Sequence, residues 1–343
     1  MSAALSPPAP RRHVAEAFRC FGADCAVHVL GDRSAALRAR TLLTGFHARF
    51  SRFDAASELS ALNADPRHAV RVSPDMVAFV HAGVAAAHRT GGLVDFTLGR
   101  ALARAGYVSD LAVDAVPLLF ALAHAPARRP ARPAPDRRWL TVSADFENSV
   151  VTRTPGTMLD SGGLKGLFAD LAAGPLQECE SYALDCGGDL RLGGALERVV
   201  TVASPFEDKI LHEYVLRTGG VATSGIGRRS WLDAGGAPAH HVLDPSTGHP
   251  AFTGVVQVTA IAPTALEAEI RAKAAVLSGP DGARRWLPDG GVIVADDGGF
   301  DVVAPSGRAR PGSAAERPSR AFPGRPSAPS GGRGRIAAAA PTR

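Results

Sequence analysis

Residues 158–189, MLDSGGLKGLFADLAAGPLQECESYALDCGGD, contain the helix and strand signals from which the fold class can be predicted. A glycine-rich turn opens a helix, and Ser181–Asp185 then forms a strand that ends in the tight turn Cys186-Gly-Gly-Asp189. Glycines where a helix begins let backbone N–H groups point at a phosphate, and Lys165 beside them supplies a cation. By itself this pattern is weak evidence, because an ordinary turn has the same composition.

Outward from this stretch, strands and helices mix without regular βαβ spacing. Strands are predicted at 24–30, 139–142, 149–152, 199–203, 213–217, 255–261 and in the final VIVADD, and helices at 34–50, from Pro74 to Gly91 and at 265–278. Ser73 and Pro74 start the second helix, and Thr264 with Glu267 forms a capping box for the third. The irregular alternation favours an α+β fold over a doubly wound sheet.

The 343 residues, 45% of them hydrophobic, are enough for one large domain. We expect residues 1–15 to be disordered, 16–304 to form the domain, and 305–343 to be a disordered basic tail. Within the domain, residues 123–137 are rich in proline and arginine, which predicts a surface loop.

The distribution of charge and apolar residues excludes some classes of function. Residues 302–343 hold eight arginines and one glutamate, so the net charge of +5 arises there and the rest is net −2. A basic nucleic-acid face on the domain is therefore not expected. The N-terminal stretch has no apolar h-region, no run is long enough to span a bilayer, and the four cysteines form no CxxC, so we expect a cytoplasmic protein with reduced thiols.

Several short motifs concentrate glycine and polar residues where an apolar scaffold does not need them. In chain order they are FGAD (21–24), FSRFDAASELSALN (50–63), GGLVDFTLG (91–99), LDSGGLKG (159–166), LDCGGDL (184–190), VATSG (221–225) and HHVLDPSTGHP (240–250). Their order and spacing resemble the FAD:protein FMN transferase (ApbE) family from about residue 18 to residue 303. The resemblance implies an α+β, T-fold-related architecture of mixed sheets packed with helices, with a flavin site between the two halves.

The same resemblance implies a reaction and its ligands. A member of the family binds FAD and a divalent metal, usually magnesium, and passes the FMN phosphoryl group to a threonine or serine of a target protein, releasing AMP. Phosphoryl transfer needs positioning, charge neutralisation and a base for the incoming hydroxyl. His241 heads the HxxDPxTG motif and is the candidate base or orienting group, although His240 beside it complicates the choice. Asp244 either belongs to the catalytic site, fixing the loop or lying near the metal, or has an ordinary turn role before Pro245.

The resemblance also assigns residues that hold FAD. Phe21 and Phe53 stand at positions where the family commonly has methionine and tyrosine, and either offers an apolar face to the flavin or packs in the core. The remaining candidates are Leu243 against the flavin, Leu93, Val94 and Asp95 gripping the nucleotide, Asp160 and Lys165 of the glycine-rich motif, and Thr223 and Ser224 as hydroxyl donors to the phosphates.

Two departures from the family pattern affect the metal site. Asp160 and Lys165 are five positions apart where the family has six, so the backbone ligand is Gly163 when counted from Asp160 and Gly162 when counted from Lys165. Glu269 stands at a metal-binding aspartate and Lys273 at a threonine ligand. A charged lysine cannot ligate magnesium. Two alternatives stay open: an ordinary i,i+4 pair with Glu269, and a lysine that points into the site and supplies positive charge.

The sequence therefore predicts an enzyme that transfers FMN from FAD to a protein, with the altered magnesium site retained. One alternative is an FAD-binding family member with little or no transferase activity. Another is an FAD hydrolase that uses water as acceptor and yields FMN and AMP.

Overall fold

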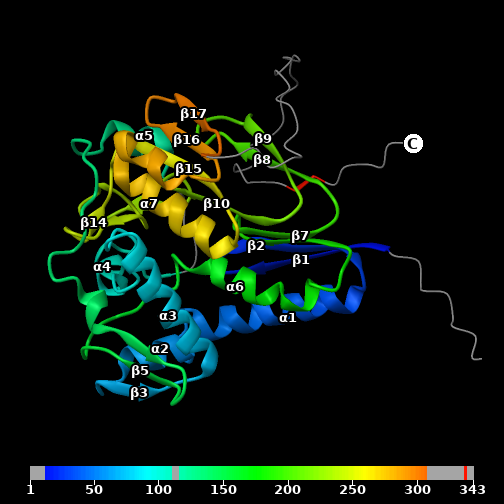
Figure 1. Cartoon of the computed structure of the whole chain (residues 1–343). Helices are drawn as coiled ribbons and strands as arrows, with labels where there is room; N and C mark the ends of the chain where they lie inside the picture. The colour runs from blue at the N-terminus through cyan, green and yellow to red at the C-terminus, as the bar shows by residue number, and fades with distance from the viewer. Residues whose placement is uncertain (1–11, 110–115, 307–335, 338–343) are drawn as a thin grey trace, which may run out of the picture.

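The computed structural model describes residues 12–109, 116–306 and 336–337. Its centre is an antiparallel eight-stranded sheet in the order β1-β2-β6-β7-β10-β15-β16-β17 (Figure 1). The strands are β1 (Arg12–Cys20), β2 (Ala23–Gly31), β6 (Ser181–Cys186), β7 (Leu190–Gly194), β10 (Gly219–Gly225), β15 (Val255–Ala262), β16 (Gly291–Ala295) and β17 (Phe300–Val303). Strands joined by long excursions lie side by side, so the chain is α+β, as predicted.

Three helices cover one face of this sheet. α1 packs on β1 and β2, α6 on β6 and β7, and α7 on β10 and β15 (Figure 1). The helices are α1 (Arg33–Phe50), α2 (Glu58–Ala64), α3 (Pro74–Arg89), α4 (Gly99–Arg104), α5 (Leu118–Ala123), α6 (Lys165–Ala172) and α7 (Ala265–Ala283), with 3-10 turns η1 (Arg138–Thr141), η2 (Gly174–Leu176) and η3 (Arg284–Trp286). Side chains alternate along β7, so Leu190 and Leu192 face the opposite side, where they pack with Val200.

Smaller sheets complete the fold around the main one. They are β3 (Ala69–Arg71) and β4 (Ser143–Asp145) flanking β5 (Val150–Thr152), β8 (Arg198–Ala203) between β9 (Ile210–Leu216) and β18 (Ile336–Ala337), β11 (Ser230–Leu232) with β12 (Pro238–His240), and β13 (Leu243–Asp244) with β14 (His249–Pro250). Within the described residues, no helix combines the length and apolar character needed to cross a membrane.

The predicted helix caps are confirmed. The Ser73 hydroxyl accepts a hydrogen bond from Met76 N, with Pro74 in the first turn, and Thr264 accepts from Glu267 N. Gly279 has φ 69° and ψ 179°, so the regular part of α7 ends there and a further turn follows Pro280. None of the four cysteines, all in the described part of the chain, forms a disulfide.

Some expected boundaries are wrong. β1 begins at Arg12, so residues 12–15 of the segment expected to be disordered pair with β2, while 1–11 lie outside the described residues. Residues 139–141 lie in η1 rather than in a strand, and Val142 is the C-cap of η1. In the expected tail, β18 pairs with β8, and 307–335 and 338–343 lie outside the described residues.

The Pro/Arg-rich segment 123–137 is irregular and mostly exposed. It is nevertheless attached to the domain by backbone hydrogen bonds, from Arg129 N to Phe252 O (3.1 Å) and from Ala131 N to Leu277 O (2.8 Å). The segment therefore lies against the domain rather than projecting from it.

Candidate functional site

Two adjoining hollows open between the glycine-rich loop, α7 and the loops after α1 and α3, and they share Tyr107, Asp160 and Gly162. We call the larger one, of about 620 Å³, the His241 pocket. Its lining includes Leu93, Val94, Asp95, Gly163, His241, Leu243 and Lys273. The smaller one, of about 380 Å³, is the Arg229 pocket, and its lining includes Phe21, Arg52, Phe53, Lys165 and Arg229.

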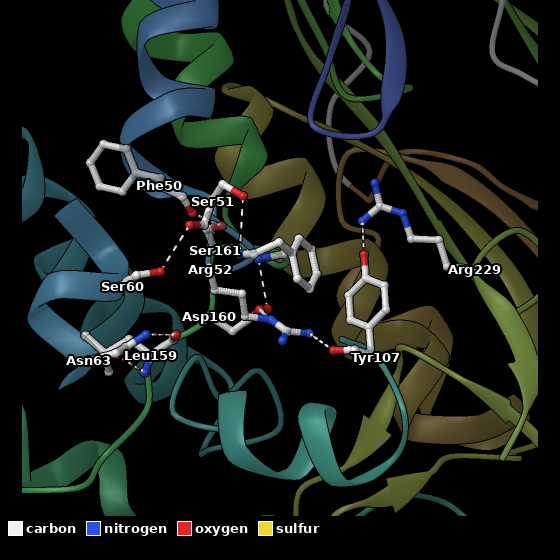
Figure 2. Close-up of polar contacts among 12 residues, drawn as sticks. Phe50, Ser51, Arg52, Ser60, Asn63, Tyr107, Leu159, Asp160, Ser161 and Arg229 are labelled. Carbon is white, nitrogen blue, oxygen red and sulfur yellow. Dashed lines mark hydrogen bonds and ion pairs between the residues drawn. The ribbon is translucent and has the colours of Figure 1, made fainter. Parts of the chain in front are cut away.

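Hydrogen bonds from α2 hold the glycine-rich loop in place. The side chain of Asn63 donates to Leu159 O (2.9 Å) and accepts from Leu159 N (2.8 Å), so one amide clamps the backbone that enters the loop (Figure 2). The Ser161 hydroxyl donates to Phe50 O at the end of α1 (2.8 Å). Asn63 of the SELSALN segment therefore fixes the backbone of the residue before Asp160, and the end of α1 fixes the residue after it.

Asp160 is held by an arginine that the sequence analysis missed. Arg52 Nε lies 2.6 Å from Asp160 Oδ1, and Arg52 Nη2 donates to Tyr107 O (2.6 Å) (Figure 2). The other carboxylate oxygen accepts from Gly162 N (2.9 Å). Asp160 therefore closes the turn at the start of the glycine-rich loop. In the sequence, the one signal for its partner was the presence of Arg52 between Ser51 and Phe53 of the FSRFDAASELSALN motif.

Arg229 and Tyr107 are also absent from the sequence-based candidates. Arg229 donates to the Tyr107 hydroxyl (3.1 Å) and to Phe21 O (2.8 Å). Phe21 adopts a positive φ of 51° in the β1–β2 turn. Its ring is stacked on Phe168 with centroids 5.3 Å apart, so most of it packs in the core while an edge lines the Arg229 pocket. Phe53 is half-buried beneath the guanidinium of Arg52.

Lys165 begins α6 and lies against a buried carboxylate. Its Nζ is 2.8 Å from Asp189 Oδ2, and the side chains of the two residues are only 13% and 4% exposed. Burial alone lowers the pKa of Lys165, but the attraction of Asp189 outweighs it and the net shift is upward. The shortened segment before it is a turn closed by Leu164 N to Ser161 O (3.0 Å). Lys165 thus stays charged at the wall of the Arg229 pocket.

The structure separates the two adjacent histidines. His240, at the end of β12, is 1% exposed and packs edge-on against Phe252, whereas His241 is half-buried and lines its pocket. Burial lowers the pKa of His241 well below its usual value, and the nearby charges of Arg229 and Lys273 lower it further. His241 is therefore a neutral imidazole near pH 7, which can accept a proton.

Asp244 does not line either pocket. Its Oδ1 accepts from Arg132 N (3.1 Å), Ser246 N (3.0 Å) and the Ser246 hydroxyl (2.8 Å), which fixes the DPSTG turn and ties the Pro/Arg-rich segment to it. These bonds agree with the expected loop-fixing and turn roles of Asp244, and its catalytic role stays a prediction. Leu243, one residue earlier, does line the His241 pocket.

Asp95 lies in the loop between α3 and α4, next to Leu93 and Val94. One oxygen, Oδ1, accepts from the Thr97 amide (2.8 Å) and hydroxyl (2.6 Å). The other, Oδ2, is buried without a hydrogen-bond partner in the described structure. Because buried polar atoms are normally paired, this oxygen is a candidate to accept an N–H from a bound ligand.

Thr223 and Ser224 are not where the sequence analysis expected them. Both lie within β10, opposite Thr259 and Val258 of β15, and the hydroxyls of Thr223 and Thr259 are 2.8 Å apart. Neither residue lines a pocket. The ATSG motif is part of a strand of the main sheet, and donation from its hydroxyls to a ligand stays a prediction.

The residues expected to bind magnesium do not fit a divalent cation. Among the described residues, no group of three or more His, Cys, Asp or Glu side chains is placed to hold a metal ion. Glu269 is buried and accepts from Gly166 N (2.8 Å), and burial raises its pKa to about 7. Lys273 Nζ lies 3.4 Å from Gly162 O. An ammonium therefore contacts the loop carbonyl, and the expected ligand set of Gly163 and Glu269 is not supported.

Comparison with known proteins identifies relatives for the whole described domain. The family model described as ApbE family matches residues 21–294. A protein named FAD:protein FMN transferase from Rhodobacter capsulatus is 29% identical over 89% of this chain and 59% of its own length, and one from Treponema pallidum is 31% identical over 65% of each. The chain thus spans less than two thirds of these relatives.

Solved structures show the same fold. The crystal structure of the ApbE protein of Thermotoga maritima superposes with a TM-score of 0.70 at 27% identity, covering 85% of this chain and 97% of that one. The flavin transferase ApbE of Vibrio cholerae, at 20% identity, superposes with a TM-score of 0.67 over 87% of this chain and 98% of that one, which supports the fold alone.

Proposed function

The chain belongs to the ApbE family, and from this premise we propose that it transfers the FMN moiety of FAD to a threonine or serine hydroxyl of a target protein, releasing AMP. The observation that carries the proposal is the position of His241: a neutral imidazole lines the same pocket as Gly162 and Gly163 of the glycine-rich loop and Lys273 of α7. This combination offers a proton acceptor beside a site for a diphosphate.

The cavity walls suit the two parts of FAD. Leu93, Val94 and Leu243 give the His241 pocket an apolar wall against which a ring system can pack. The unpartnered oxygen of Asp95 can accept a ring N–H. Lys273 lines the His241 pocket beside the glycine-rich loop, and its charge can offset that of a phosphate. Lys165, in the adjoining pocket, is already paired with Asp189.

The transfer is a displacement at phosphorus. The acceptor oxygen forms a bond to the FMN phosphorus while the bond from that phosphorus to the oxygen of the AMP phosphate breaks, and AMP leaves with the bonding electrons. The hydroxyl proton passes to His241, whose lowered pKa keeps it unprotonated before the reaction. No step is assigned to magnesium, because the residues present do not fit it.

Two other reactions use the same cavity. Water in place of the acceptor hydroxyl would hydrolyse FAD to FMN and AMP, and a chain that binds FAD without reacting would need only the cavity walls. His241 favours the transferase and the hydrolase over the binder, since binding alone requires no proton acceptor. The transferase and the hydrolase differ in the acceptor: a transferase attaches FMN to a protein hydroxyl, whereas a hydrolase releases free FMN.

The test is incubation of the full chain with FAD and a candidate acceptor protein carrying the hydroxyl, followed by intact-mass analysis of the acceptor and assay of AMP. We expect an added FMN and equimolar AMP, and a rate about 10²–10⁴-fold lower in His241→Ala. The matched control is His240→Phe, which removes the adjacent core histidine and should retain transfer.

FMN and AMP without an adduct would identify a hydrolase. FAD binding with neither product, on two acceptors, would identify a binding protein. An unchanged rate in His241→Ala would remove His241 from the mechanism.

A further inference from the structure

We propose that Lys273 replaces the divalent cation expected in this site, so that FAD binding and FMN transfer by this chain need no added metal. The inference rests on the proposed function for the identity of the ligand, a diphosphate. Beyond that function, it names the positive charge that binds the diphosphate.

The ammonium lies at the contact between α7 and the glycine-rich loop. Lys273 Nζ is 3.4 Å from Gly162 O, and a Cβ at Gly163 would lie 2.5 Å from the same nitrogen. The absence of a side chain at Gly163 therefore makes room for the ammonium. Lys273 also lines the His241 pocket together with Asp160 and His241, so it faces the ligand space.

Lys273 is the lysine of the cavity whose charge is least neutralised by the protein. Lys165 is paired with Asp189 at 2.8 Å, and the third lysine of the chain, Lys209, is an exposed residue paired with Glu207. Within the described residues, no carboxylate oxygen lies within 4.0 Å of Lys273 Nζ. An ammonium has three N–H donors, of which the Gly162 carbonyl uses one. Two remain for phosphate oxygens.

The position of Lys273 is fixed by the helix that carries it. One turn earlier, Glu269 accepts from Gly166 N (2.8 Å), which ties α7 to the start of α6. A Cβ at Gly166 would lie 2.5 Å from the carbonyl carbon and oxygen of Ala265, so the two helices touch at this glycine. The lysine is thus held beside the loop before the ligand arrives, as electrostatic preorganisation requires.

In the transfer step, Lys273 donates hydrogen bonds to phosphate oxygens and remains an ammonium. The bond changes are those already described: the acceptor oxygen bonds to the FMN phosphorus, the bond to the AMP phosphate breaks, and the proton goes to His241. Burial lowers the pKa of Lys273, while the charges of Glu269 and Asp160 oppose that shift. In its ammonium form Lys273 offsets negative charge without gaining or losing a proton in this step.

The experiment measures FAD affinity by isothermal titration calorimetry and transfer by intact mass, each in EDTA and in magnesium. For the unmodified chain we expect both quantities to agree within about three-fold between the two conditions. For Lys273→Met we expect FAD affinity to fall about 10–100-fold, the size of a charge-assisted hydrogen-bond loss, with no recovery in magnesium.

Lys273→Thr supplies an oxygen ligand in place of the ammonium. We expect its affinity to fall in EDTA and to recover at least in part with magnesium. Lys273→Arg, which keeps the charge, should retain more affinity than Lys273→Met. Lys209→Met is the matched control, because Lys209 is 53% exposed and lines neither pocket, and it should match the unmodified chain. Thermal unfolding of each variant reports whether it has folded.

The outcomes separate this inference from the proposed function. Transfer that occurs only with magnesium in the unmodified chain would overturn the role of Lys273 and leave the transferase intact. Metal-independent FAD binding that is lost in Lys273→Met, without any adduct, would support the role of Lys273 and count against the transferase. Lys273→Met binding FAD as well as the unmodified chain would also overturn the inference.

Discussion

The two pockets of the cavity differ in how their polar groups are satisfied. In the Arg229 pocket, Arg52 is paired with Asp160, Lys165 with Asp189, and Arg229 bonds to the Tyr107 hydroxyl and to Phe21 O. In the His241 pocket, Asp95 Oδ2 and His241 Nδ1 are buried without a hydrogen-bond partner among the described residues, and there Lys273 Nζ contacts one backbone carbonyl, that of Gly162.

This difference separates scaffold from reactive surface. A group already paired within the protein changes little when a ligand binds, whereas an unpaired buried group gains most from a ligand that satisfies it. We infer that the Arg229 pocket holds the glycine-rich loop in shape and that the His241 pocket makes the contacts on which binding and reaction depend.

The strongest challenge to this division is to remove one lysine from each pocket. Lys165→Met should lower the free energy of unfolding by about 3–5 kcal/mol, because it leaves the buried carboxylate of Asp189 unpaired. Lys273→Met breaks no ion pair among the described residues and should cost much less. Urea denaturation measures both. The double variant Lys165→Met/Asp189→Leu should recover most of the loss, and equal losses for the two single variants would break the comparison.

A second test addresses the unpaired oxygen of Asp95. Asp95→Asn keeps an acceptor for Thr97 but places a donor where Oδ2 was, so FAD affinity should fall about 10–100-fold with little change in stability. Fluorescence quenching of FAD measures the affinity. Asp136→Asn, an exposed carboxylate nearby that lines neither pocket, is the control. Unchanged affinity in Asp95→Asn would mean that Oδ2 meets no ligand.

The buried titratable groups behind the pockets should affect stability with opposite signs. Burial lowers the pKa of His240 from 6.5 to about 3, so below pH 6.5 the unfolded chain holds a proton that the folded chain lacks, and stability falls as pH falls. Burial raises the pKa of Asp185 from 3.8 to about 7, so between those values the folded chain holds the extra proton and stability falls as pH rises. Between about pH 4 and 6.5 the two effects oppose each other.

Each contributes a slope of about 1.4 kcal/mol per pH unit in that window. We expect Asp185→Asn to make the chain lose stability more steeply on acidification, and His240→Phe to make it lose stability less steeply. Urea denaturation at several pH values between 4.5 and 6.5 provides the slopes. Identical slopes in both variants and the unmodified chain would show that neither group keeps its buried protonation state.

The smallest expected effect concerns His241, which should not take up a proton as the pH falls through 6.5. Burial, Arg229, Lys273 and His240 all lower the pKa of His241, so its imidazole should stay neutral as pH falls through 6.5. The imidazole nitrogen signals in NMR, assigned with His241→Ala, report the protonation state directly. A transition centred near pH 6.5 would place His241 in solvent and contradict its location in the pocket.

Local signals in the sequence predicted much of the fold correctly. Ser73-Pro74 and Thr264 mark helix starts because their hydroxyls satisfy backbone N–H groups within a few residues, and this chemistry needs no distant partner. The segment 139–142 was misread as a strand because a short apolar run has no clear periodicity. The motif order likewise placed Leu93, Val94, Asp95, His241 and Leu243, all of which line one pocket.

The sequence by itself therefore determined the α+β class, the ends of the main helices and the set of motifs, since each is encoded by residues close together in the chain. Only the tertiary structure decided which members of those motifs meet. Arg52 reaches Asp160 across 108 residues and Lys273 reaches Gly162 across 111, contacts that depend on how α1 and α7 pack beside one loop. Of two adjacent histidines, His240 at the end of β12 packs in the core and His241 just after it lines the cavity, and Thr223 and Ser224 stay in the sheet because β15 pairs with them.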